Sequence, residues 1–220
     1  MFIVFGSKVK KVKKMNDDYY SYMSKLFGKW AYFYDLVSIF ISASGTRDRV
    51  VDLVDAKRNS RILDLCTGTG DQAFAFGKRG YRVIGVDLSE KMLRLAEKKN
   101  KYENVRFVVA DAVNLPFKDD CFDVSCISFA LHDMPQDIRD VVLTEIRRVS
   151  KRVVVVDYNI PKSGLHRWLH VSVASLYESK YYHDFVKRDL IEILRLHSLR
   201  VVEEAYGLVD FIKILICEKV

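Results

Sequence analysis

Residues 61–71 read RILDLCTGTGD, an apolar run that passes directly into a glycine-rich turn. This order predicts a buried β-strand, a tight turn and the first residue of a helix. Gly68 and Gly70 let the backbone turn sharply and approach a ligand closely, because glycine has no Cβ. Asp87 ends the next apolar run, and its carboxylate can accept hydrogen bonds from both hydroxyls of a ribose. These features predict a nucleotide-type cofactor pocket at one edge of a parallel sheet.

Two cofactor classes use such a pocket. The spacing of Gly68, Gly70 and Ala73 also satisfies the loose dinucleotide fingerprint, so an NAD(P)-dependent oxidoreductase is an alternative. A module that binds a cofactor without catalysis is another. Asp64 lies inside the first strand, where its carboxylate can organise the turn or reach the cationic amino-acid end of S-adenosylmethionine. Asp71, at the start of the helix, would repel a pyrophosphate. The two acidic residues therefore favour S-adenosylmethionine.

Strand and helix patterns alternate after residue 60, which predicts a mostly parallel sheet with helices on both faces. The strands are predicted at 61–65, 81–87, 105–110, 122–128 and 152–158. The helices are predicted at 70–79, 89–100, 136–149, 165–179 and 187–197. Two final strands, at 199–206 and 211–218, should form an antiparallel hairpin at the C-terminal edge. The predicted fold class is therefore α/β, with a Rossmann-like sheet of seven strands.

The length of 220 residues suits one well-buried domain and is short for two. Residues 1–15 are expected to form a flexible basic tail, and residues 16–220 a single domain. Within that domain, 16–57 are expected to form N-terminal helices and 58–220 the Rossmann-like core. The helical segment is rich in aromatic residues, so it can either pack on the sheet or form a lid over the pocket. Met1 and Met15 are both candidate start residues.

Much of the net charge of +7 lies in an N-terminal lysine tract, Lys8, Lys10, Lys11, Lys13 and Lys14. No recognised nucleic-acid motif accompanies the tract, so no nucleic-acid partner is expected. A solvated tail is the expected role, with electrostatic attachment to anionic lipid as the alternative. No apolar run reaches the roughly 18 residues of a membrane span, and four scattered cysteines indicate reduced thiols. A cytoplasmic protein with an option of peripheral membrane contact is therefore expected.

Asp111 and Ala112 follow the third strand, where they can line an adenine, and Ser128 ends the fourth strand. With these residues the chain resembles class I S-adenosylmethionine-dependent methyltransferases, and more narrowly the ubiquinone/menaquinone biosynthesis C-methyltransferase family. The matching pieces are Tyr34–Leu36, Asp64–Asp71, Gly85–Ser89, Met92–Leu93, Asp111–Ala112, Leu115–Phe117 and Ile127–Leu131. The chain departs from the quinone enzymes at His132-Asp133, where they typically carry Arg-Asn. It also has Val149–Arg152 in place of a Lys-Pro-Gly-Gly turn.

The resemblance implies an enzyme that transfers a methyl group from S-adenosylmethionine to a small molecule and releases S-adenosylhomocysteine. The narrower match implies C-methylation of a prenylated quinone precursor. The alternatives are O- or N-methylation of another small molecule or of a phospholipid headgroup. The resemblance also implies that the N-terminal helices cover the site, with Tyr20, Tyr32 and Tyr34 in the lid. Leu165–Val171 lies where this class places substrate-recognition insertions, although packing in the core is the expected role of its apolar side chains. The sequence does not fix the oligomeric state.

The expected cofactor site gathers at the carboxyl ends of the strands. Gly68 and Gly70 would leave space for the methionine part, and Ser128 would lie near the sulfonium. The full set expected to bind the cofactor is Asp64, Thr67, Gly68, Thr69, Gly70, Asp87, Leu88, Asp111, Ala112 and Ser128.

The expected catalytic residues follow the fourth and fifth strands. A phenolic or carbon nucleophile must lose a proton, and His132 is the candidate general base, with Asp133 beside it. Tyr158 and Asp157, at the end of the fifth strand, are alternates. A capping or surface role for His132 is equally compatible with the sequence. No metal site is expected, because His166 and His170 lack a third ligand at a useful spacing.

Overall fold

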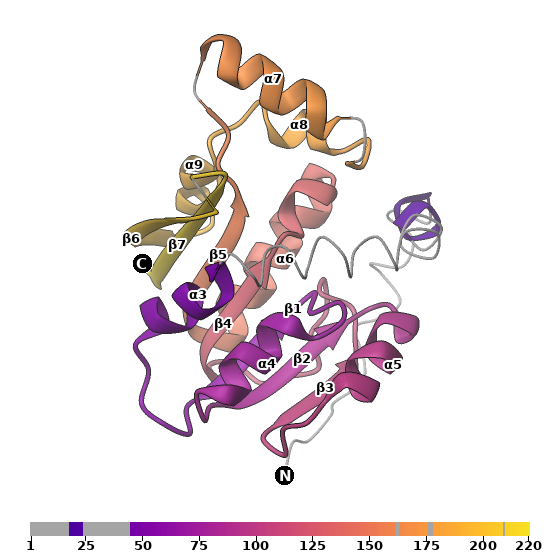
Figure 1. Ribbon diagram of the computed structural model, residues 1–220, viewed down its shortest axis with the longest axis vertical. Helices are drawn as coiled ribbons and strands as arrows, with labels where there is room; N and C mark the ends of the chain where they lie inside the picture. The colour runs from indigo at the N-terminus through magenta and orange to yellow at the C-terminus, as the bar shows by residue number, and fades with distance from the viewer. Residues whose placement is uncertain (1–17, 24–44, 162, 176–177, 209) are drawn as a thin grey trace.

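The computed structural model describes residues 18–23, 45–161, 163–175, 178–208 and 210–220. These residues form one seven-stranded sheet in the order β3-β2-β1-β4-β5-β7-β6 (Figure 1). The strands are β1 (Arg61–Leu65), β2 (Arg82–Asp87), β3 (Val105–Val109), β4 (Phe122–Ser128), β5 (Ser150–Tyr158), β6 (Leu199–Gly207) and β7 (Ile212–Lys219). The pairs among β1 to β5 are parallel, and β7 runs antiparallel to both β5 and β6. The predicted α/β sheet with its antiparallel C-terminal edge is confirmed.

Helices cover both faces of this sheet. The helices are α3 (Thr46–Val54), α4 (Asp71–Lys78), α5 (Glu90–Lys99), α6 (Gln136–Val149), α7 (Gly164–Ala174), α8 (Tyr182–Phe185) and α9 (Leu190–Leu196), with a 3-10 turn η1 (Leu131–Asp133). Helices α3 and α4 share one apolar core with the sheet, whereas α6 and α9 share another. Ser89 caps α5 as its sequence predicts, since its hydroxyl accepts a hydrogen bond from the Met92 amide at 3.3 Å.

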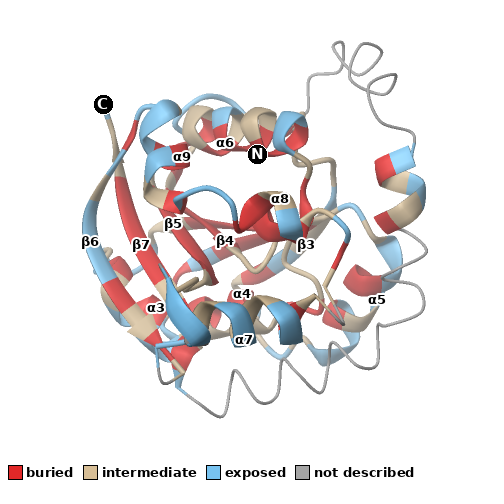
Figure 2. Ribbon diagram, turned by 90° about the horizontal axis from the view of Figure 1, so that it is seen from above, coloured by how far each residue is buried: buried red, intermediate tan, exposed pale blue. Residues whose placement is uncertain are grey.

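Strand β5 shows why the sheet has two cores. Val153 and Val155 belong to the core beneath α6 and α9, and Val154 and Val156 belong to the core beneath α3 and α4. Alternate side chains of a strand point to opposite faces, so four consecutive valines fill both cores at once. Figure 2 shows the resulting band of buried residues along β4, β5 and β7.

The predicted N-terminal helices are described only in part. Residues 18–23 are helical, and α3 packs on α4 and β7 with Val50, Val51 and Val54 buried. Helix α3 therefore packs on one face of the sheet. The basic tail 1–15 and most of 24–44 lie outside the described residues, and the single-domain boundaries stay a prediction. Among the helices that the structure describes, none has the length and hydropathy that a membrane span requires.

One helix predicted in the C-terminal half was too long, since the helix expected at 165–179 ends at Ala174. The helix expected at 187–197 is present as α9, and the short helix α8, which was not predicted, precedes it. Core packing of the segment Leu165–Val171 was also wrong for its largest side chains. Leu165 and Trp168 are 67% and 63% exposed. Helical periodicity identifies an apolar face, but it does not say whether another element covers that face.

Candidate active site

The turn after β1 has the geometry that its glycines predict. Gly68 and Gly70 have φ angles of 55° and 86°, and Cys66 between the strand and the turn has 57°. The Gly70 amide donates to the Thr67 carbonyl at 2.9 Å and closes the turn. A Cβ on Gly70 would lie 2.8 Å from the Phe107 ring, whereas one on Gly68 would meet nothing within 4 Å. Gly70 is therefore packed against the protein, and Gly68 borders open space where a ligand can approach.

Asp64 lies fully inside the sheet beneath this turn. The Thr67 hydroxyl donates a hydrogen bond to its carboxylate, so the side chain is tied to the loop. Burial raises the pKa of Asp64 to about 7, against the opposing effects of the Thr67 hydrogen bond and the Arg47 guanidinium. The observed contact is the turn-organising one of the two roles considered for Asp64.

Asp87 joins the tips of β1 and β2. One carboxylate oxygen accepts a hydrogen bond from the Gly68 amide at 2.9 Å, and the other accepts one from the Ser89 amide at 2.8 Å. Burial raises the pKa of Asp87, although these amide donors favour its charged form. Each carboxylate oxygen can accept a second hydrogen bond, so both remain able to receive a ribose hydroxyl. Leu88 beside it is 50% exposed and offers an apolar surface.

The remaining predicted cofactor residues lie at the same edge of the sheet. The parallel register pairs Leu65 with both Val86 and Ile127, so β1, β2 and β4 end side by side. Asp111 follows β3 and accepts a hydrogen bond from the Val113 amide at 3.1 Å, next to Ala112. Two further hydroxyl groups are held locally: Ser128 lies 3.4 Å from Cys126 Sγ, and Thr69 lies 3.5 Å from Asp71.

The helical segment 18–23 lies close to two separate parts of the site. Burial and the charge of Asp111 raise the pKa of Tyr20, which places Tyr20 near the predicted adenine side. The Tyr22 hydroxyl accepts a hydrogen bond from the Lys180 amide at 3.3 Å, and its ring lies 5.9 Å from that of Tyr181. The segment therefore connects Asp111 with the chain that precedes α8. The other predicted lid residues, Tyr32 and Tyr34, lie outside the described residues.

A buried group of polar side chains, termed here the His132 cluster, lies beyond the ends of β4 and β5. Its members are His132, Asp133, Asp157, Tyr158 and Glu178. His132 Nδ1 lies 2.7 Å from Asp157 Oδ1, and Nε2 lies 3.1 Å from Glu178 Oε2 and 3.6 Å from Asp133 Oδ2. The Tyr158 hydroxyl donates to Glu178 Oε1 at 2.5 Å. The structure thus brings together all the predicted catalytic residues, and adds Glu178.

The electrostatics of the cluster follow from this geometry. Burial alone would lower the pKa of His132, but the nearby carboxylates of Asp157, Asp133 and Glu178 hold it well above its ordinary value. Burial raises the pKa of Asp133. A positive charge on the His132 side chain therefore balances part of the carboxylate charge, and an unpaired carboxylate at this depth would be costly.

Hydrogen bonds to backbone groups hold two segments of the cluster in place. Arg139 is buried in α6 and donates hydrogen bonds to the Leu131 carbonyl at 3.0 Å and the Met134 carbonyl at 2.7 Å, which fixes η1 and hence His132. The Glu178 amide donates to the Ala174 carbonyl at 2.9 Å at the end of α7. No local sequence pattern links Glu178 to His132. The two residues are far apart in the sequence and meet only because of the course that the chain takes through α7.

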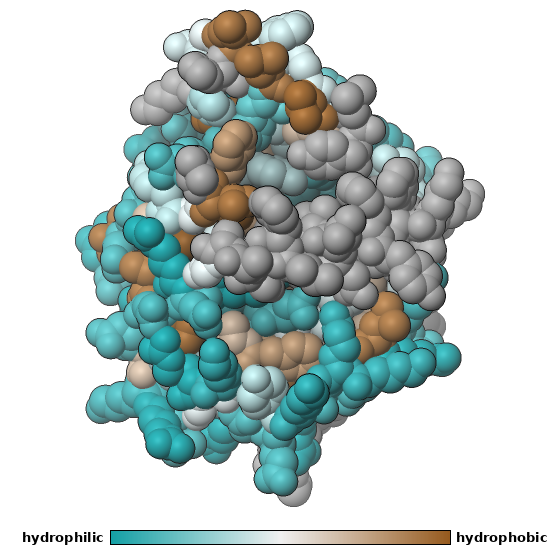
Figure 3. All heavy atoms as spheres, in the orientation of Figure 1, coloured by the Kyte–Doolittle hydropathy of each residue, from teal (hydrophilic) through white to brown (hydrophobic). Residues whose placement is uncertain are grey.

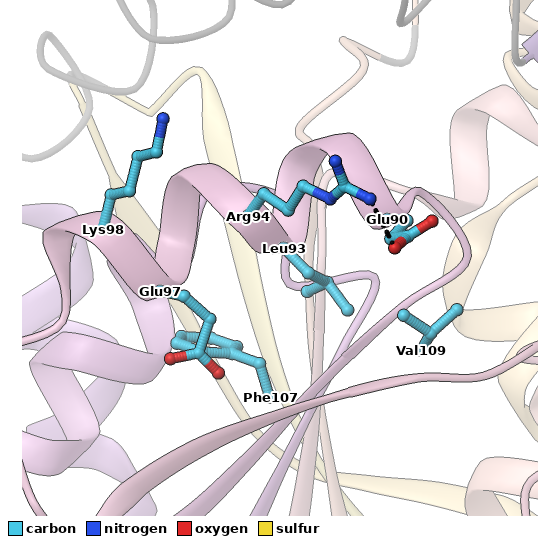
Figure 4. Close-up of a pocket in the computed structure, with 7 residues that line it drawn as sticks. All are labelled: Glu90, Leu93, Arg94, Glu97, Lys98, Phe107 and Val109. Carbon is cyan, nitrogen blue, oxygen red and sulfur yellow. Dashed lines mark hydrogen bonds and ion pairs between the residues drawn. The ribbon is translucent and has the colours of Figure 1, made fainter.

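A groove of about 480 Å³ lies elsewhere, between α5 and β3 (Figure 4). Its lining residues are Glu90, Leu93, Arg94, Glu97, Lys98, Phe107 and Val109. Arg94 and Glu90 form an ion pair across its upper side at 2.8 Å. None of the predicted site residues lines this groove, although Val109 is the register partner of Asp87.

The fold is shared with solved methyltransferases. A methyltransferase from Methanosarcina mazei has a TM-score of 0.61 at 20% identity, over 75% of this chain and 94% of that one. An S-adenosylmethionine-dependent methyltransferase from Aquifex aeolicus has a TM-score of 0.58 at 20% identity, over 79% and 89% of the two chains. At this level of identity the likeness concerns the fold.

Sequence relatives narrow the comparison. A demethylmenaquinone methyltransferase from Thermotoga maritima is 39% identical over 58% of this chain and 56% of that protein. The corresponding protein from Paenarthrobacter aurescens is 35% identical over 62% and 55%. The chain therefore spans about half the length of these curated relatives. The model of the ubiE/COQ5 methyltransferase family matches residues 10–167, and the chain belongs to this family.

Proposed function

We propose that the chain transfers a methyl group from S-adenosylmethionine to a ring carbon of a quinone precursor. The family and the demethylmenaquinone methyltransferases among its relatives support this reaction. The observation that carries the proposal is the junction at Asp87. One carboxylate holds the Gly68 and Ser89 amides and still faces the edge where β1, β2 and β4 end. This arrangement suits a ligand that has both a ribose and an amino-acid part.

The proposed cofactor contacts use the chain's own groups. Asp87 would accept hydrogen bonds from the ribose hydroxyls, and Asp111, Ala112 and Leu88 would line the adenine. The turn that contains Thr67, Gly68, Thr69 and Gly70 would receive the methionine part, with Ser128 near the sulfonium. When bound, the cofactor supplies an electrophilic methyl carbon. The task of the protein is to align the acceptor with that carbon, since methyl transfer is an in-line displacement.

The acceptor half of the site is assigned to the His132 cluster. A carbon nucleophile must lose a proton as the methyl group is transferred, and His132 is the proposed base. Its raised pKa means that the imidazole must give up a proton before it can act as a base. Tyr158 and Asp133 would then orient the acceptor and the base.

Helix α7 supports a membrane-bound acceptor. Leu165, Trp168, Leu169 and Val173 lie on one helical face and are 45% to 67% exposed. Figure 3 shows apolar side chains gathered at this end of the molecule, and Figure 1 shows α7 beyond the carboxyl end of β5. A tryptophan with aliphatic neighbours on an exposed helix suits the boundary of a lipid bilayer. We therefore place the lipid contact on α7, close to the His132 cluster.

Sedimentation with vesicles of phosphatidylethanolamine and phosphatidylglycerol tests this contact. The double variant Leu165→Ser/Trp168→Ser should sediment several-fold less than the unmodified protein. Leu196→Ser is the matched control, because Leu196 is 72% exposed on α9, away from this face. Equal sedimentation of the double variant and the control would remove α7 from the proposal.

Ligand competition tests the reaction class. S-adenosylhomocysteine should bind and displace S-adenosylmethionine, whereas NAD and NADP should not compete. Tight NAD binding would favour the oxidoreductase instead. Methylation of a polar amine or of a phospholipid headgroup, in place of a quinone, would retain the methyltransferase and change its acceptor.

A further inference from the structure

The spacing of three atoms in the His132 cluster matches the coordination of a metal ion. His132 Nε2, one oxygen of Asp133 and one of Glu178 all lie within 4.8 Å of one another, and Nε2 lies 3.1 Å from Glu178 and 3.6 Å from Asp133. Around an ion with ligands at about 2.1 Å, neighbouring ligand atoms lie about 3.0 Å apart in an octahedron and about 3.4 Å apart in a tetrahedron. Both separations from Nε2 lie near this range.

An unpaired buried oxygen atom of one proposed ligand supports a cation at this position. Within the described residues, Asp133 Oδ1 has no hydrogen-bond partner, although Asp133 is only 3% exposed. Three carboxyl groups surround a single imidazole in this cluster. Buried charge of this kind is ordinarily paired or bound to a metal.

The surroundings of the three atoms are those of a metal site. Asp157 holds Nδ1 of His132 at 2.7 Å, which fixes the ring and directs Nε2 toward the other two carboxylates. A carboxylate in this position is the usual second-sphere partner of a metal-binding histidine. Glu178 is similarly fixed by the Tyr158 hydroxyl on its other oxygen. Both ligands are therefore oriented by neighbours that would not themselves contact the ion.

We propose that His132 Nε2, Asp133 and Glu178 bind a divalent first-row transition-metal ion. One nitrogen and two carboxylates suit Zn²⁺ or Mn²⁺ better than Mg²⁺, which prefers an all-oxygen shell. The sequence predicted no metal site, because His166 and His170 lack a third ligand and Glu178 reaches His132 only through the tertiary fold. Three protein ligands leave positions for water or for an oxygen of the acceptor. A bound ion would lower the pKa of that oxygen and so favour loss of its proton, and it would take the place of His132 as the group that promotes deprotonation.

Titration of the metal-free protein with Mn²⁺, followed by the electron paramagnetic resonance signal of the free ion, tests the site without any activity assay. We expect one bound ion per chain, and Kd values at least tenfold higher for Glu178→Gln and Asp133→Asn. Asp157→Asn should weaken binding by about 10- to 100-fold through its effect on His132. Asp119→Asn is the control, because this carboxylate is 76% exposed and pairs with Arg148. Zn²⁺ should compete with Mn²⁺.

Two results would overturn the site: no saturable Mn²⁺ or Zn²⁺ binding by the unmodified protein, or equal binding by the two ligand variants and the control. Circular dichroism on the same samples shows that each variant is folded, and His132→Gln serves as a further ligand variant if one of them is not. S-adenosylhomocysteine binding on the same samples reports on the cofactor half of the proposed function. Retained cofactor binding without metal binding therefore removes the metal site alone.

Discussion

Asp87 is the residue on which the cofactor half of the site most depends. Its two oxygens hold the Gly68 and Ser89 amides, so its role combines positioning of the turn with a contact to the ligand. Asp87→Asn keeps the size of the side chain and one acceptor oxygen. We expect it to weaken S-adenosylhomocysteine binding by about 2 kcal/mol, or about 30-fold, as measured by calorimetry. Unchanged affinity would show that the ribose is bound elsewhere.

Because Asp64 is buried and its pKa is raised, its titration should make the free energy of unfolding depend on pH. Its pKa is about 7 in the folded protein and about 3.9 in an unfolded chain. Between these values the folded state holds a proton that the unfolded state releases, so this contribution to stability falls as pH rises and levels off above about 7. Asp64→Asn removes the contribution while keeping an acceptor for Thr67.

The measurement is urea unfolding of both proteins from pH 5 to pH 8. The free energy of unfolding of the unmodified protein, minus that of Asp64→Asn, should fall by about 2.5 kcal/mol over this range. Taking the difference cancels the titration of the other groups. A difference that stays constant with pH would mean that Asp64 is ionised in the folded protein throughout.

At the scale of elements, close packing between β2, β3 and the turn holds the crevice in shape. A Cβ on Gly85 of β2 would lie 2.6 Å from the Phe107 ring and 2.9 Å from the Thr67 hydroxyl. Gly85→Ala should therefore lower the free energy of unfolding by about 1–3 kcal/mol and weaken cofactor binding by displacing Thr67. Thermal unfolding and calorimetry measure the two effects.

A double-mutant cycle isolates the cause. The cost of Gly85→Ala should be smaller in a Phe107→Ala background, because the shorter side chain leaves room for the added methyl group. An equal cost in both backgrounds would show that the contact with Phe107 is not the source of the strain.

The bounds of elements with clear borders were predictable, whereas the surroundings of an exposed helix face were not. Strands β1 to β4 were predicted to within one residue at each end, because turn residues and charges bound their apolar runs. Helix α7 has an equally clear apolar face, yet that face is exposed. Periodicity cannot tell a face that meets the core from one that meets another partner.

At the scale of the whole molecule, the two halves of the site differ in how far the sequence could predict them. The cofactor half follows from strand ends, where parallel topology fixes which residues meet. His132, Asp157 and Tyr158 were also named, since they follow neighbouring strands. Glu178 could not be found in this way, because it reaches His132 only after the chain has crossed α7. The contact between Glu178 and His132 therefore depends on the tertiary fold.

Methyl transfer to demethylmenaquinone that is kept in its reduced, hydroquinone form in lipid vesicles, followed with methyl-labelled S-adenosylmethionine, is the decisive test of the proposed reaction. The unmodified protein should place the label in the quinone fraction, and Asp87→Asn should slow that transfer at subsaturating cofactor. Metal-loaded protein is included beside metal-free protein, so that the reaction is tested in both states. S-adenosylmethionine binding with no label in the quinone fraction in either state would contradict the proposed acceptor. Absence of S-adenosylmethionine binding would contradict the methyltransferase itself.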